Sequence, residues 1–132
     1  MATAVINDLK KATKGLLYPS ETDEPFQTFL WKDGGDTLAT EEFLRLSGHK
    51  QGSNVEPVQL EEFFADLTTD QDWYGETEKA TARKYRQLLQ TLKKHLSDLR
   101  VFRVGKVDLE IYIVGKTPSG DWAGIKTKAV ET

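Results

Sequence analysis

The clearest helical pattern in the chain lies in residues 76–96 and is followed directly by segments with the period of β-strands. Apolar side chains recur every three or four residues along it, at Tyr85, Leu88, Leu89, Leu92 and Leu96. An amphipathic helix of this kind buries its apolar stripe against another layer. From Val101 onward apolar and polar residues alternate, as in strands with one buried face. The sequence therefore predicts a sheet covered by a long helix.

Three strands are expected after this helix, at residues 101–104, 107–114 and 123–132. The inward face of the second strand holds Val107, Leu109, Ile111 and Ile113, and its other face holds Asp108 and Glu110. The inward parity changes between the first two strands, so Gly105-Lys106 is predicted to be a tight turn or a bulge. Residues 116–120 form a second turn. Consecutive strands joined by short turns predict an antiparallel β-meander covered by helices.

The first half of the chain is expected to begin with a helix and continue into an acidic loop. Val5, Leu9, Ala12 and Leu16 recur at helical spacing, and Gly15 is placed to end that helix. Residues 18–25 contain two prolines and predict a bent acidic loop. Residues 25–31 are aromatic and alternating, which predicts a strand that residues 33–36 interrupt.

Two short helices are expected next. The first runs from Thr40, a candidate N-cap, to Gly48. The second holds apolar residues at i, i+3, i+4 and i+7: Leu60, Phe63, Phe64 and Leu67. Between them, residues 52–58 predict a loop that contains at most a short strand.

The bulk composition fits one globular domain spanning residues 1–132. Hydrophobic residues make up 38% of the chain and charged residues 30%, a balance that argues against wholesale disorder. The chain has no cysteine, which excludes disulfides, a thiol nucleophile and thiolate metal sites and fits a reducing compartment. No secretory signal pattern and no apolar run of membrane-spanning length occur. We expect a cytoplasmic protein that does not enter membranes.

The distribution of charge argues against a nucleic-acid binder. The net charge is −3, with acid concentrated in residues 21–24 and 66–78 and at Glu131. The basic residues of 79–103 resemble the solvated side of one helix. A nucleic-acid surface needs a continuous basic face with interleaved aromatic residues. Direct binding of nucleic acid is therefore not expected.

Motifs for catalysis are weak. The two histidines, His49 and His95, belong to no local catalytic motif, and structural or surface roles are expected for both. The segment from Asp70 to Gly75 begins like a calcium loop, but Thr81 stands where a bidentate glutamate is needed. No catalytic residue, metal site or cofactor of the chain's own is predicted.

The segment from Asp70 to Gly75 is better interpreted as a contact surface. Trp73 and Tyr74 lie among Gln71 and Asp72, a composition typical of interface hot spots. Alternatively, Trp73 packs inward as a lid on the long helix and Tyr74 alone is exposed. The acidic residues Glu21 and Asp23 are either contacts or solvated loop charges. Thr132 either offers its oxygens as a fixed anionic tip or simply ends the strand.

Short matches along the whole chain resemble one known family, the sugar-non-specific nuclease inhibitors (nuclease A inhibitor-like proteins). They are Gly15-Leu-Leu17, Ser20-Glu21, Pro25-Phe26 with Phe29-Leu-Trp31, Gln71-Asp-Trp-Tyr74, Gly115-x-Thr-Pro-x-Gly120, Ala123-Gly-Ile125 and Val130-Glu-Thr132. The matches occur in order and share the chain end.

The resemblance implies an α/β/α sandwich of the pathogenesis-related-1-like type, with helices on a mainly antiparallel sheet. It also implies a non-enzymatic protein, monomeric when free, that inhibits a magnesium-dependent ββα-metal nuclease of DNA and RNA in a 1:1 complex. By this similarity Thr132 approaches the partner's catalytic metal and Glu21 meets an arginine of its cleft. The remaining implied contacts are Gln71 and Trp73, with Asp72, Tyr74 and Glu131 as additional candidates.

Four residues depart from the family pattern or add to it. Pro19 and Glu24 flank the acidic segment and would re-aim Glu21, and Gly75 would loosen the segment after Tyr74. Trp122 is either an extra contact or a core residue. A second interpretation therefore stays open: a non-enzymatic sandwich domain that binds another protein or a ligand, with the inhibitor function lost or redirected.

Overall fold

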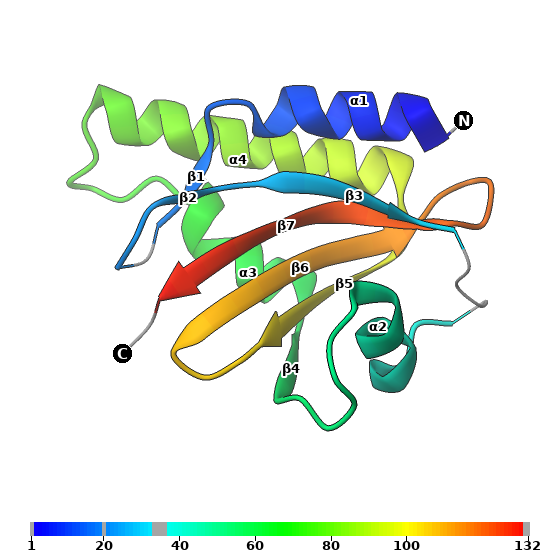
Figure 1. Cartoon of the computed structure of the whole chain (residues 1–132). Helices are drawn as coiled ribbons and strands as arrows, with labels where there is room; N and C mark the ends of the chain where they lie inside the picture. The colour runs from blue at the N-terminus through cyan, green and yellow to red at the C-terminus, as the bar shows by residue number, and fades with distance from the viewer. Residues whose placement is uncertain (1, 20, 33–36, 131–132) are drawn as a thin grey trace.

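The computed structural model describes residues 2–19, 21–32 and 37–130. Figure 1 shows a curved sheet with helices on both of its faces. The elements in chain order are α1 (Ala2–Thr13), β1 (Leu17–Tyr18), β2 (Glu24–Pro25), β3 (Gln27–Trp31), α2 (Thr40–Ser47), β4 (Val55–Val58), α3 (Leu60–Thr68), α4 (Glu76–His95), β5 (Ser97–Val104), β6 (Asp108–Lys116) and β7 (Trp122–Val130).

The central sheet has five strands in the order β3-β7-β6-β5-β4, and every neighbouring pair is antiparallel. The predicted meander is confirmed as β5-β6-β7. The strands from the first half of the chain, β3 and β4, extend it at its two edges. Residues 18–25 were predicted to be loop throughout, which is wrong, because β1 and β2 pair with each other and leave only 19–23 as the connection.

One face of the sheet packs against α1, α3 and α4. Residues of the α4 stripe lie in this core beside Leu9 of α1 and Phe64 of α3, and Leu88 and Leu92 are fully buried. The sheet contributes Ile111 of β6 and matching apolar residues of β5 and β7. The long helix predicted from its apolar stripe thus buries that stripe in this core, together with α1 and α3.

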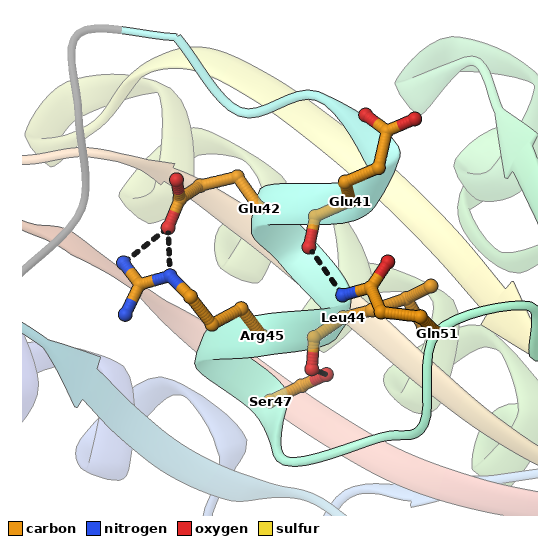
Figure 2. A network of polar contacts seen from close by, with 6 residues as sticks. All are labelled: Glu41, Glu42, Leu44, Arg45, Ser47 and Gln51. Atoms are coloured by element: carbon orange, nitrogen blue, oxygen red, sulfur yellow. Dashed lines mark hydrogen bonds and ion pairs between the residues drawn. The ribbon is translucent and has the colours of Figure 1, made fainter.

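The opposite face packs against α2 and the residues before it. Phe43 of α2 stacks on Phe102 of β5 with ring centroids 4.2 Å apart, and it meets Tyr112 of β6 edge-on. Leu38 and Trp122 complete this second core. On its outer side α2 carries an ion pair between Arg45 and Glu42, in which Arg45 Nε lies 2.7 Å from Glu42 Oε1 (Figure 2). The fold is an α+β sandwich with helices on both faces.

Several local expectations need correction. Thr40 is the first residue of α2 and not its N-cap, because Ala39 holds that position and provides no side-chain hydrogen bond. The strand expected at 101–104 begins four residues earlier, at Ser97. Val107 precedes β6, and its side chain is 47% exposed. Trp122 is a core residue, since it is fully buried.

The turn between β5 and β6 requires glycine, as its position in the sequence suggested. Gly105 has φ of 112°, a conformation that side-chain-bearing residues rarely adopt. A Cβ atom there would also overlap the carbonyl oxygen of Asp108. Asn54 fixes the turn to the neighbouring loop, because its carbonyl accepts the Gly105 N–H at 2.9 Å.

Two tyrosine hydroxyls are bound inside the fold. Tyr85 of α4 donates to the Leu17 carbonyl at 2.6 Å, and Tyr112 donates to Glu110 Oε1 at 3.2 Å. Burial raises the pKa of Tyr85 above its ordinary value of 10.0, and nearby negative charge on Tyr18 and Asp23 adds to the effect. Burial likewise raises the pKa of Tyr112, together with the charge of Glu110.

These shifts predict a loss of stability in alkali. Since each folded-state pKa is raised, the stabilisation is complete below the ordinary pKa of 10.0 and disappears as the pH rises toward the folded-state value. Each tyrosine should add about 1.4 kcal/mol per pH unit to the decline of the free energy of unfolding. Urea unfolding should be measured between about pH 9 and 11, around the ordinary tyrosine pKa. The free energy of unfolding should then decline less steeply with pH for Tyr85→Phe and for Tyr112→Phe than for the wild type. If the free energy of unfolding had the same slope against pH in all three proteins, the raised tyrosine pKa values would be contradicted, because lysine titration is common to all three.

Candidate functional site

An acidic loop, the connection between β1 and β2, lies at the end of the sheet where β7 finishes. Its backbone is fixed there, because the Glu21 N–H donates to the Val130 carbonyl at 3.1 Å. Pairing of β1 with β2 holds the loop on both sides, with Tyr18 opposite Glu24. The Glu21 and Asp23 side chains are exposed. The acidic loop is therefore a short, held connection that presents carboxylates to solvent.

A second loop, residues 69–75, connects α3 to α4. The Tyr74 N–H donates to the Gln71 carbonyl at 3.0 Å and closes a turn around Asp72 and Trp73. Gly75 is the N-cap of α4, and its N–H donates to Glu78 Oε1 at 3.0 Å. Gly75, which was expected to loosen this segment, is thus the residue through which the loop enters the helix.

Trp73 is the most exposed large hydrophobic side chain among the described residues, at 75% of its surface. Of the two orientations that the sequence left open, the inward lid on α4 is wrong. Its ring meets the half-buried ring of Tyr74 edge-on, with centroids 4.7 Å apart. Gln71 is half-buried and Asp72 is exposed. An exposed tryptophan supported by a second ring offers a large apolar contact area to a partner.

The two loops border one groove of about 380 Å³. Its lining comes from β1, the start of the acidic loop, α3, the 69–75 loop and α4: Leu17, Pro19, Asp66, Leu67, Trp73, Tyr74, Thr77, Glu78, Thr81, Ala82 and Tyr85. Because Pro19 and Trp73 line the same groove, the acidic loop lies beside the 69–75 loop. Figure 1 shows both at the end of the molecule where β7 finishes.

Several exposed acidic side chains belong to the segments at this end. Glu21, Asp23, Asp66 and Asp72 are exposed there. Asp70 is exposed as well, but its carboxylate lies 3.5 Å from Nη1 of Arg86, which also donates to the Thr68 carbonyl. Clustered carboxylates create a negative potential that attracts a cationic surface.

Five of the predicted contact residues thus occupy one end of the fold: Glu21, Gln71, Asp72, Trp73 and Tyr74. Thr132 and Glu131 lie outside the described residues. Glu24 is half-buried in β2 and its backbone pairs with β1.

Sequence reasoning missed the groove and Leu17. In an extended segment two successive side chains point to opposite sides, so only one of Leu16 and Leu17 can enter the core. Leu16 is 2% exposed and Leu17 is 47% exposed. The Leu16-Leu17 pair was the available signal for an exposed apolar side chain.

The two histidines connect elements elsewhere in the fold. His49 Nε2 lies 3.0 Å from the Tyr112 hydroxyl and 3.5 Å from Glu110 Oε2, which joins the segment after α2 to β6. His95 Nε2 lies 2.8 Å from Asp8 Oδ2 and joins α4 to α1. Both side chains therefore make contacts between structural elements, the role expected for them.

Among the described residues, no three His, Asp or Glu side chains are grouped so that they could together hold a metal ion. Within the same part of the chain, no helix combines the length and the apolar composition needed to cross a membrane.

The comparisons with known proteins give one positive result. The model of the family described as nuclease A inhibitor-like protein matches residues 3–132. Curated proteins gave no match. The match spans both loops, the groove and every strand of the sheet, and it supports a nuclease-inhibitor-like role in general terms. This chain belongs to the nuclease A inhibitor-like family.

Proposed function

We propose that this protein inhibits a magnesium-dependent, sugar-non-specific ββα-metal endonuclease by occupying its active site, and that it is not itself an enzyme. The observation that carries the proposal is the exposed Trp73, which stands beside an acidic loop at one end of the fold. Family membership supports the same partner class. The proposed complex is 1:1, formed in the cytoplasm by an inhibitor that is monomeric when free and does not bind nucleic acid itself.

The chemistry of a nuclease cleft explains why such a surface fits it. The cleft receives phosphates, so it is basic and holds a hard cation that prefers oxygen ligands. Carboxylates on a folded scaffold replace the charge of the substrate but offer no bond to cleave. In the proposed complex Glu21 pairs with an arginine of the cleft, and Gln71 and Trp73 pack around that contact.

The proposal extends to the last residues of the sequence. Thr132 would approach the partner's magnesium through its terminal oxygens, with Glu131, Asp72 and Tyr74 as additional contacts. Val130, to which the acidic loop is hydrogen-bonded, is two positions from Thr132 in the sequence. A metal-directed oxygen and the Glu21 carboxylate would thus reach the cleft together.

A stoichiometric titration tests the function directly. Increasing amounts of the protein are added to a purified ββα-metal nuclease of this class, and cleavage of plasmid DNA and of RNA is followed. We expect both activities to disappear at an equimolar ratio, because one inhibitor fills the one active site that serves both substrates. Undiminished cleavage at a large excess would reject the inhibitor function and favour a sandwich domain that binds another protein or a ligand.

Glu21→Gln should weaken inhibition by about tenfold, the loss that accompanies removal of one charge-assisted contact. The association rate should also depend less on ionic strength, because one steering charge is lost. Glu41→Gln is the matched control: Glu41 is exposed on α2, which covers the other face of the sheet, and its carboxylate points away from Arg45 (Figure 2). Stopped-flow association at several salt concentrations measures both effects. Equal behaviour of the two variants would exclude steering by Glu21.

A tag fused after Thr132 should weaken inhibition by about 30-fold or more, which is the effect of removing a hot-spot contact of about 2 kcal/mol. Its thermal unfolding midpoint should stay close to that of the untagged protein. The same tag placed before Met1 controls for the bulk of the fusion. Full inhibition by the C-terminally tagged protein would eliminate the metal-directed role of Thr132.

A further inference from the structure

Exposed apolar side chains gather in the groove between the two loops. Among the described residues three large hydrophobic side chains are strongly exposed, and two of them, Leu17 and Trp73, line this groove. Leu67 adds half-buried apolar surface, and Ala82 and Tyr85 of α4, both almost fully buried, also belong to the lining. Exposed apolar groups that gather in one concavity mark a contact site more strongly than scattered ones do.

The polar groups of the groove are carboxylates. Asp66 of α3 is exposed, and no ion pair of this residue occurs among the residues that the structure describes. Glu78 lies on the other side, where one of its oxygens accepts the Gly75 N–H. No lysine, arginine or histidine is among the lining residues. The groove therefore combines an apolar wall with two carboxylates and no basic lining residue, which favours a cationic occupant.

The aromatic side chains beside the groove indicate which kind of cationic group would bind there. The rings of Trp73 and Tyr74 meet edge-on at 88°, so they present two differently directed surfaces beside the groove. A guanidinium group stacks on such faces, pairs with carboxylates, and carries an aliphatic stem that packs on apolar side chains. At about 380 Å³ the groove lies near the lower end of the range of roughly 300–1,000 Å³ typical of small-ligand sites. One long side chain suits it better than a large ligand.

We propose that this groove is a socket for an arginine side chain projecting from the nuclease, distinct from the cleft arginine paired with Glu21. The inference rests on the proposed function and adds a second cationic contact to it. Its guanidinium stacks against Trp73 and pairs with Asp66, while its stem packs on Leu17 and Leu67. The two arginine contacts use different parts of the acidic loop: Pro19 lines the groove, whereas Glu21 lies two residues later, where its N–H donates to the Val130 carbonyl.

Two pairs of variants test the socket in the nuclease complex. Asp66→Asn is compared with Glu62→Gln, which makes the same change of net charge one turn earlier on α3 and outside the groove. Leu17→Ala is compared with Val107→Ala, since both side chains are 47% exposed and only Leu17 lines the groove. Each groove variant should raise the inhibition constant about tenfold and each control should leave it unchanged. Thermal unfolding of all four checks that the fold is intact.

A probe experiment separates failure of the socket from failure of the proposed function. N-acetyl-arginine methylamide is titrated against the isotope-labelled protein at millimolar concentration, with the uncharged N-acetyl-citrulline methylamide as control. The arginine derivative alone should shift the backbone amides of Leu17, Leu67 and Thr77, and Asp66→Asn should abolish the shifts. If the wild type fails to inhibit the nuclease, the proposed function falls and this titration alone decides the socket. Groove variants that inhibit like their controls, or amide shifts that do not distinguish the two probes, would overturn it.

Discussion

A sheet that is apolar on both faces is the constraint on which the rest of this fold depends. β6 lies in the middle of it and directs Ile111 and Ile113 to one core and Tyr112 and Val114 to the other. Neither set can stay in water without a cost of roughly 25 cal/mol for each Å² of apolar surface, so both faces require cover. α1, α3 and α4 cover one face, and α2 covers the other. The loops at the end of the sheet take their positions from this layered arrangement.

The sequence predicted the α4 side of the fold better than the α2 side. The stripe through Leu88 and Leu92 and the alternation through Ile111 and Ile113 are periodic signals, and both predicted elements are confirmed. The other face of β6 was predicted to be polar because Asp108 and Glu110 lie on it. Farther along β6, however, the residues on that face are apolar. Strand order escaped prediction as well, because pairing of β3 with β7 joins residues about a hundred positions apart.

For the candidate site, residue type was predictable and geometry was not. The composition around Trp73 and the family resemblance suggested candidate contact residues, but two opposite orientations of the ring fitted the pattern equally well. Its exposure is decided by the packing of Tyr74 and by the hydrogen bonds that close the loop. The groove lies between β1, α3 and α4, and no local sequence pattern predicts that these three elements meet. Loops held in this way lose little conformational entropy on binding, which favours affinity without additional contact area.

The hydrogen bond from the Glu21 N–H to the Val130 carbonyl has a thermodynamic consequence for how this end of the molecule works. It couples the acidic loop to the end of β7, so a change that breaks this bond would remove a support from both segments. Substitutions in the two segments should then be non-additive, with a double variant that loses less than the sum of the single losses. Contacts made by the two segments would share a coupling free energy that belongs to neither alone.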